Sequence, residues 1–385
     1  MPNSFSLYVH IPYCISKCPY CDFNSHVVAN IPEQTYTEAL VCELKAHSVL
    51  ETWANRSIKT VFFGGGTPST FSGQSIATVL DKAAGLFQLD ANAEVTLEAN
   101  PGTVDAKYFR DYRRAGINRI SIGAQTFNAR LLEFLGRVHS ARETHAAVTT
   151  VRAAGFDNFS LDLIYAMPGQ STAEVRDDLL EGLKNKPPHM SVYNLTIEEG
   201  TPFHTKFQQG QLQPLDEDTE IDMAHAVVQT LGEAGLRRYE ISNYAQAGYE
   251  SRHNVNYWQG GDYLGIGAGA HSFNRRWNSP GGIRQQNERI PARYIRSIKE
   301  TGQAVTGEET PGPCQAMGEH LFTGLRLLRG ISISAFQERF GTKPHEAFPK
   351  ITQWLDESLL AEDNGSLRFT EAGLLLANEL FVEFV

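Results

Sequence analysis

The 385-residue sequence has no apolar run that approaches the ~20 residues a membrane-spanning helix needs. Its N-terminus shows no basic segment followed by an apolar stretch, so we expect no secretory signal peptide. Internal repeats and low-complexity tracts are also lacking. These absences point away from a membrane protein or a repeat array. Length and an ordinary composition predict a globular protein with one large domain and a smaller one.

Basic residues are fewer than acidic ones: the sequence has 34 Lys and Arg and 44 Asp and Glu, which gives a net charge of −10. A chain with this balance is not expected to have nucleic acid as its partner. The charge is uneven, since residues 237–296 hold nine Arg, no Lys and four acidic residues. Such a cluster is usually a solvated face, but the planar guanidinium group also suits the recognition of carboxylates.

Cysteine is scarce as well, with five residues in the chain. Cys14, Cys18 and Cys21 stand too close together to form a disulfide framework, which favours a protein of the reducing cytoplasm. We expect Cys42 and Cys314 to be buried thiols that behave as small apolar residues.

The segment HIPYCISKCPYCDF places Cys14, Cys18 and Cys21 in a C-x3-C-x2-C pattern. Four thiolates saturate a 4Fe–4S cluster, so three leave one iron with an open position, as a catalytic metal site does. The alternative is a structural zinc site with His10 or His26 as the fourth ligand. Zinc sites usually combine C-x2-C with a second, distant pair, and this chain has none. The pattern therefore favours an iron–sulfur cluster.

The first two thirds of the chain alternates short β-branched or aromatic runs with helical stretches. We expect strands at residues 6–11, 59–65, 94–100, 118–124, 159–167 and 189–197. We expect helices at residues 35–50, 74–86, 104–115, 141–154, 172–184 and 216–235. The polar motifs fall at strand ends, where barrels build their sites. The α/β pattern therefore predicts a partial (β/α)6 barrel in preference to an open doubly wound sheet.

Three domains are expected: the barrel at 1–235, an extension at 236–310 and a C-terminal module at 311–385. The extension contains a passage, residues 260–269, with too many glycines for an ordinary helix or strand. The last module has the helix–helix–helix–hairpin–helix order of a winged-helix-like fold. Because its helices are acidic, we expect a structural or interaction cap and no binding of DNA.

Residues 63–68, Phe-Gly-Gly-Gly-Thr-Pro, end the second expected strand and allow a ligand to approach the backbone closely. Together with the three-cysteine loop, this segment resembles the radical S-adenosylmethionine (SAM) superfamily. The resemblance implies that the amine and carboxylate of SAM chelate the open iron of a 4Fe–4S cluster bound by the three cysteines. It also implies SAM contacts at Gly65, Gly66 and Thr67.

Four polar residues stand where a strand pattern would place apolar ones: Glu98, Gln125, Arg137 and Asp162. Each alone could cap a loop, but on successive strands they predict one cofactor pocket. Their motifs, together with Tyr8, resemble the oxygen-independent coproporphyrinogen III oxidase family over nearly the whole chain. The resemblance implies that an electron from the cluster cleaves SAM to methionine and a 5′-deoxyadenosyl radical.

Two local departures from the oxidases bear on function. Phe23 stands where the oxidases carry a further cysteine that they need for activity, so the resemblance to an oxidase is incomplete. His253 opens the segment HNVNYW, which resembles the HNxxYW motif of the HemW family, a heme-binding branch. That resemblance implies heme binding at His253. The arginine excess around this segment supplies candidate partners for the two heme carboxylates, and Arg252 is the one adjacent in sequence. The alternative is a loop histidine bonded to backbone.

The favoured hypothesis is a cytoplasmic heme chaperone of the HemW type, which passes heme to apo-hemoproteins such as those of the respiratory chain. A homodimer and peripheral association with a membrane are further expectations from the resemblance. The second hypothesis is an oxygen-independent coproporphyrinogen III oxidase, which Phe23 counts against. A third, a radical SAM enzyme acting on something unrelated, would leave HNVNYW without a role.

Overall fold

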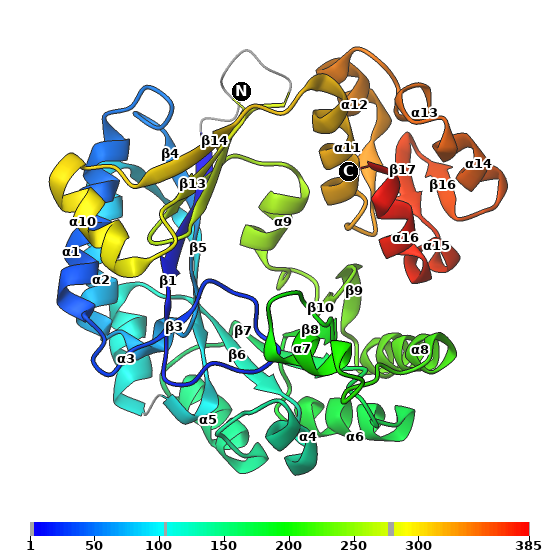
Figure 1. Cartoon of the computed structure of the whole chain (residues 1–385), viewed down its shortest axis with the longest axis horizontal. Coiled ribbons are helices and arrows are strands. Elements are labelled where there is room, and N and C mark those ends of the chain that lie inside the picture. Colours follow the sequence, from blue (N-terminus) through cyan, green and yellow to red (C-terminus); the bar gives the residue numbers. More distant parts are fainter. Residues whose placement is uncertain (1–3, 104–105, 276–280, 385) are drawn as a thin grey trace.

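The computed structural model describes residues 4–103, 106–275 and 281–384 (Figure 1). Its centre is a run of six parallel strands that neighbour one another in chain order. They are β1 Ser4–Ile11, β4 Ser57–Gly65, β5 Gln88–Ala99, β6 Arg119–Gln125, β7 Phe159–Tyr165 and β8 His189–Asn194. These strands correspond to the six expected ones. Within the described residues, the curved sheet has two free ends, at β14 and β9, and therefore does not close into a full barrel (Figure 1). The predicted partial barrel is confirmed.

Helices cover the outer side of this curved sheet (Figure 1). They are α1 Glu33–Ser48, α2 Gly73–Leu86, α3 Ala106–Ala115, α5 Ala141–Ala153, α6 Thr172–Leu183 and α8 Glu217–Glu233. The short helices α4 Ala129–Phe134 and α7 Pro202–Gln208 pack on each other, and α7 also contacts the cysteine loop. Side chains define several of their starts. Ser140 and Ser171 form capping boxes with the Glu three residues later, and Asp216 caps α8. Each expected helix is present, and the short helices α4 and α7 were not expected from the sequence. The first two residues of the helix expected at 104–115 lie outside the described residues.

Short strands extend the sheet at both edges. At one edge β11 pairs in parallel with β1 and is followed by an antiparallel series; at the other, β10 and β9 follow β8 in antiparallel pairs. The bounds are β9 Arg237–Glu240, β10 Asn243–Ala245, β11 Tyr263–Ile266, β12 His271–Asn274, β13 Ile283–Asn287 and β14 Val305–Glu309. The glycine-rich passage thus contains the regular strand β11, contrary to the expectation from its composition. Its Gly265 packs against the His271 backbone, which leaves no space for a side chain.

Three further segments complete this part: a two-stranded pair, β2 Tyr13–Cys14 with β3 His26–Val27, and the helices α9 Arg252–Trp258 and α10 Pro291–Thr301. Helix α9 lies at the open side of the sheet, between the barrel and the C-terminal unit (Figure 1).

The C-terminal unit has its own apolar core, which includes Leu321, Phe336, Trp354 and Phe381. Its elements are α11 Pro313–Gly324, β15 Ile331–Ser332, α12 Ile333–Phe340, α13 Pro344–Ala347, α14 Lys350–Asp356, β16 Leu360–Asp363, β17 Ser366–Phe369, α15 Glu371–Leu375 and α16 Ala377–Phe381. Helices, a hairpin and further helices follow one another as the winged-helix-like pattern predicts.

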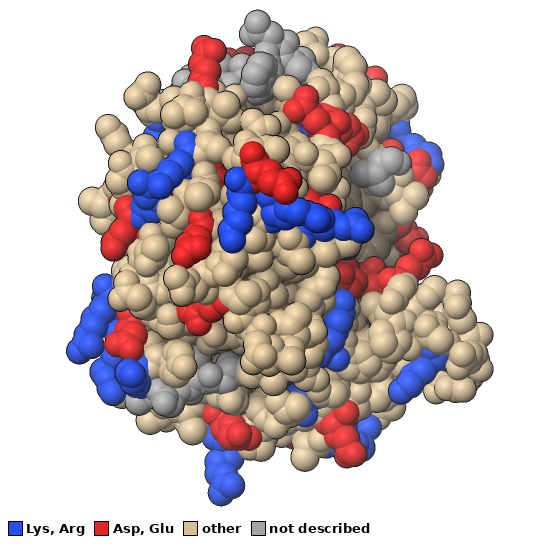
Figure 2. Space-filling view, turned by 60° about the vertical axis from the view of Figure 1, so that its left-hand side comes forward, with Lys and Arg blue, Asp and Glu red and all other residues tan. Residues whose placement is uncertain are grey.

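The surface carries both signs of charge side by side on the face that Figure 2 shows, with uncharged residues between them. None of the helices in the described part of the chain is long and apolar enough to cross a bilayer. One expectation was wrong: Cys42 and Cys314 are both exposed. Cys42 lies on the outer face of α1, while its neighbour Glu43 is buried.

Candidate functional site

A cavity of about 480 Å³ opens at the inner side of the parallel strands, beneath the cysteine loop. The structure brings twelve of the residues predicted to hold a cluster, SAM or heme to the wall of this one cavity. They are Tyr8, Cys14, Cys18, Cys21, Gly65, Gly66, Thr67, Glu98, Gln125, Arg137, Asp162 and His253. These residues come from seven helices and strands and from three loops, and the curvature of the sheet places them together.

Cys14 ends β2, Cys18 and Cys21 follow in the loop before β3, and two of the three sulfurs accept hydrogen bonds from the barrel. Thr67 Oγ1 lies 3.5 Å from Cys14 Sγ, and Arg137 Nη1 lies 3.5 Å from Cys18 Sγ. Burial raises the pKa of the Cys14 and Cys21 thiols. Among the described residues, no three His, Cys, Asp or Glu side chains are placed to hold a single metal ion. In a 4Fe–4S cluster the thiolates bind different irons and surround a volume, and three cysteines of one loop offer ligands of this kind.

Hydrogen bonds within the protein engage the two histidines considered as a fourth zinc ligand. His10 Nε2 donates to the carbonyl of Asn24 at 2.9 Å, and Nδ1 accepts from the Tyr8 hydroxyl at 2.9 Å. Nε2 of His26 lies 3.2 Å from Asn24 Oδ1. Both ring nitrogens of His10 and one of His26 are therefore engaged within the protein, and the donor set fits an iron–sulfur cluster better than zinc.

Asn100 joins the cysteine loop to the strand ends, although the sequence analysis did not single it out. Its Nδ2 donates to Thr67 Oγ1 at 3.1 Å, and its Oδ1 accepts from Arg137 Nη2 at 2.6 Å. The same guanidinium donates to the Gly123 carbonyl at 3.0 Å. A signal was present, because Asn100 stands two residues after Glu98 and strand side chains alternate between faces.

Glu98 and Asp162 are the carboxyl groups that the strands β5 and β7 bring into the cavity. Glu98 Oε2 accepts from the backbone N–H of Gly65 at 3.3 Å. Asp162 accepts from the hydroxyls of Ser121 at 2.6 Å and Ser160 at 2.8 Å. Burial, with the nearby charge of Asp162, raises the pKa of Glu98 to about 8. The cavity can therefore present both donors and acceptors to a ribose hydroxyl pair.

The glycines at the end of β4 are needed for close packing against neighbouring elements. Gly65 has φ +119°, and a Cβ there would lie 2.6 Å from the His10 ring. A Cβ on Gly66 would lie 2.7 Å from the carbonyl oxygen of Tyr13. The turn at Gly65 and Gly66 can therefore pack closely against His10 and Tyr13, the residues that lead into the cysteine loop. Gln125, at the end of β6, also has a positive φ, 66°, next to an irregular pairing with β7.

His253 is fully buried, and both of its ring nitrogens are hydrogen-bonded. Thr60 Oγ1 lies 2.8 Å from Nδ1 and donates its own proton to Ser6, so Nδ1 is the protonated nitrogen of the ring. The Tyr257 hydroxyl lies 2.8 Å from Nε2 and donates to it. Burial lowers the pKa of His253 to about 3, so the ring is neutral. The guanidinium of Arg252, named above as a candidate partner of a heme carboxylate, donates to the Asn92 carbonyl at 2.6 Å.

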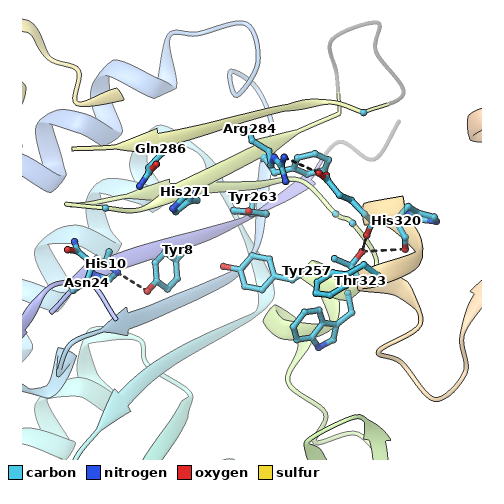
Figure 3. Close-up of a pocket in the computed structure, with 18 of the residues that line it drawn as sticks. Tyr8, His10, Asn24, Tyr257, Tyr263, His271, Arg284, Gln286, His320 and Thr323 are labelled. Atoms are coloured by element: carbon cyan, nitrogen blue, oxygen red, sulfur yellow. Dashed lines mark hydrogen bonds and ion pairs between the residues drawn. The ribbon is translucent and has the colours of Figure 1, made fainter. Parts of the chain in front are cut away.

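A second, outer cavity of about 770 Å³ adjoins the first. Tyr8, Phe23, Gly65, Glu98 and Tyr257 line both of them. Figure 3 shows its walls, which come from the sheet edge with β12 and β13, from α9 and from α11 of the C-terminal unit.

Comparisons with known proteins agree with this architecture. The family model for the radical SAM superfamily matches residues 8–181, and that for the HemN C-terminal domain matches residues 313–376. The curated heme chaperone HemW of Haemophilus influenzae is 38% identical over 385 residues, covering 99% of this chain and 97% of that protein. The chain belongs to the HemW family. HemW of Escherichia coli is likewise 38% identical, covering 99% of this chain and 98% of the relative.

The fold of this HemW-family chain is also that of a solved radical SAM enzyme. Coproporphyrinogen III oxidase (HemN) from Escherichia coli matches it with a TM-score of 0.83 and 22% identity, covering 100% of this chain and 90% of the oxidase. At this identity the likeness establishes the fold, including the C-terminal unit. The radical SAM family in turn implies binding of a 4Fe–4S cluster and SAM.

Proposed function

We propose that this chain is a heme chaperone, which binds heme and transfers it to acceptor hemoproteins while a 4Fe–4S cluster and SAM occupy the barrel. The observation that carries the proposal is the match, over 99% of the chain, to relatives named heme chaperone HemW. The adjoining cavities support it, because one contains the three thiols and the other has room for a second large ligand.

In this proposal Cys14, Cys18 and Cys21 hold the cluster. When bound, the cluster and SAM supply one-electron chemistry. The residues of the chain bind and orient these groups: Thr67 and Arg137 fix two of the sulfurs through hydrogen bonds. Tyr8, Gly65, Gly66, Glu98, Gln125 and Asp162 complete the SAM pocket in this proposal.

The biological setting of the proposal is the cytoplasm, where a reducing environment protects exposed thiols and a cluster. Acceptors are apo-hemoproteins, those of the respiratory chain among them, and both a homodimer and peripheral association with the membrane belong to the proposal. In it, the cluster and SAM control the conformation or dimerisation of the chaperone more than they catalyse a reaction.

An oxidase function receives less support from the site. Phe23 occupies the position of the oxidases' additional cysteine, and its side chain is 60% exposed at the rim that both cavities share. No thiol stands there to act on a porphyrinogen. The likeness to HemN establishes a common fold and leaves the reaction to experiment.

The test is an anaerobic titration of the cluster-loaded protein with hemin, followed by absorbance, and then by transfer to an apo-cytochrome. We expect saturation near one heme per chain and recovery of the heme in the acceptor. Absence of saturable binding at micromolar hemin would contradict the proposal. Conversion of coproporphyrinogen III to protoporphyrinogen IX with SAM and a strong reductant would establish the oxidase in its place.

A further inference from the structure

The outer cavity has the size and the walls that a flat macrocycle requires. Its volume of about 770 Å³ exceeds the 480 Å³ of the cavity with the cysteines. Pockets for small molecules and cofactors span roughly 300–1,000 Å³ and are mostly apolar. Seven aromatic side chains, whose rings can pack on a porphyrin face, line this one. They are Tyr8, Phe23, Tyr257, Trp258, Tyr263, Phe273 and Phe322.

Three histidines line this cavity, and they differ in whether a ring nitrogen is available. Both nitrogens of His10 are hydrogen-bonded, as described above. Nδ1 of His320 accepts from Arg339 Nη1 at 3.2 Å, so its Nε2 carries the proton and offers no lone pair. The ring of His271, on β12, has no hydrogen-bond partner among the described residues and is exposed to the cavity (Figure 3).

The surroundings of His271 keep its ring in the form that binds iron. Burial lowers its pKa, and the positive charges of Arg289 and Arg284 lower it further. The imidazole is therefore neutral near pH 7, and a neutral imidazole is the commonest protein ligand of heme iron.

Two arginines at the same wall differ in their pairing. Arg284 Nη2 lies 2.8 Å from a carboxylate oxygen of Glu309 and 2.9 Å from one of Glu319, so its charge is already balanced. Arg289 is exposed at the rim of the cavity, and none of the ion pairs found among the described residues includes it. Its backbone is held in place, because the Asn24 side chain donates to its carbonyl at 2.9 Å. A guanidinium in this position is suited to a heme carboxylate.

We propose that the outer cavity is the heme site, with His271 as the ligand of the iron and Arg289 as the partner of a heme carboxylate. This inference rests on the proposed heme-chaperone function and assigns its ligand a place. It also gives the HNVNYW segment a role. Tyr257 and Trp258 line the outer cavity, and His253, which stands one helical turn before Tyr257, fixes the hydroxyl of that tyrosine.

The decisive experiment compares hemin binding to full-length, anaerobically reconstituted protein by absorbance and electron paramagnetic resonance. His271→Ala is set beside His253→Ala, with His225→Ala, an exposed residue of α8, as the matched control. We expect His271→Ala alone to lose the spectrum of an imidazole-bound iron, with affinity at least about tenfold weaker. Added imidazole should restore that spectrum. His253→Ala should weaken binding without changing the iron's ligand.

Retention of the imidazole-bound spectrum in His271→Ala, with its loss in His253→Ala, would overturn the assignment and make His253 the ligand. Failure of the unaltered protein to bind hemin would overturn the heme-chaperone proposal, and this site with it. The carboxylate contact is tested with Arg289→Ala, titrated with hemin and with hemin dimethyl ester, which has no free carboxylates. We expect weaker binding of hemin and unchanged binding of the ester; equal losses for both would overturn the role of Arg289.

Discussion

The hydroxyl of Tyr257 lies 2.8 Å from Nε2 of His253, in a position where the histidine is completely buried. Nδ1 of the same ring is bonded to Thr60 on β4, so the histidine ties α9 to the inner face of the sheet. Tyr257 thereby stands at the boundary between the thiol-lined cavity and the outer cavity. The position of Tyr257 at this boundary therefore depends on its hydrogen bond to His253 within helix α9.

Tyr257→Phe should lower the free energy of unfolding by about 1–2 kcal/mol, because it leaves the buried Nε2 of His253 without a donor. The measurement is chemical denaturation of the single variants Tyr257→Phe and His253→Ala and of the double variant. We expect the two losses to be non-additive by more than about 0.5 kcal/mol. Strict additivity would show that the hydrogen bond contributes nothing.

Cluster binding should depend on each of the three clustered thiols and on no other cysteine. Cys18→Ala should reduce the iron content after reconstitution from about four atoms per chain to near zero, since two thiolates cannot hold the cluster stably. Cys42→Ala is the matched control, because Cys42 is an exposed thiol on the outer face of α1. Iron analysis and the absorbance of the cluster measure both. Full iron content in Cys18→Ala would refute the assignment of the ligands.

The stability of the cofactor-free protein should depend on pH through Glu98. Its pKa in the folded protein is raised from 4.5 to about 8, mainly by burial, so the unfolded chain loses the proton first as the pH rises. Stability that the neutral carboxyl contributes is complete below about pH 4.5 and is lost as the pH rises through about 8. Water in the cavity reaches part of this half-buried side chain, which moderates the effect.

Glu98→Gln keeps an acceptor for the Gly65 N–H and cannot ionise, so it isolates this contribution. The melting temperature of the variant should equal that of the unaltered protein at about pH 4.5 and exceed it increasingly toward about pH 8. Thermal denaturation across this range provides the comparison. A constant difference between the two proteins at all pH values would mean that Glu98 ionises normally in the folded state.

Glu43 anchors the glycine-rich passage to α1. Its carboxylate accepts from the Gly267 N–H at 2.9 Å, from Asn287 Nδ2 at 2.6 Å and from the Tyr294 hydroxyl at 2.7 Å. Glu43→Ala would leave these buried donors unpaired and should cost about 3–5 kcal/mol of stability. Glu38→Ala, at an exposed position of the same helix, should change stability by less than about 0.5 kcal/mol. Equal unfolding curves for the two variants would contradict this role.

Several features of the site could be predicted from the sequence, because they depend on the spacing of residues that are close together in the chain. The three cysteines, the glycine turn after β4 and the alternating strands and helices each carry a local pattern with a direct physical meaning. Glu98 and Asp162 could be identified because a carboxylate within an otherwise apolar strand has to be satisfied by something nearby. The parallel order of the strands then follows from the helical connections.

The errors and omissions of the sequence analysis share one cause, which is that they depend on contacts between residues far apart in the chain. On α1 the sequence analysis expected Cys42 inside, yet Cys42 is exposed and its neighbour Glu43 is buried. Glu43 is stable there because donors 224, 244 and 251 positions away surround it. No sequence pattern singled out His271, which follows a glycine-rich passage. The role of Asn100 became visible only in the structure, where its side chain accepts a hydrogen bond from Arg137.

The sequence by itself predicted the cluster of three thiols and the strand–helix alternation of the barrel, because local chemistry and periodicity encode them, and its motifs carried the resemblance to the family. Only the tertiary structure decided that His253 is enclosed while His271 faces an open cavity. That difference arises from how β12, α9 and α11, far apart in the chain, pack around the same space, and no local pattern specifies which side chain such packing leaves accessible.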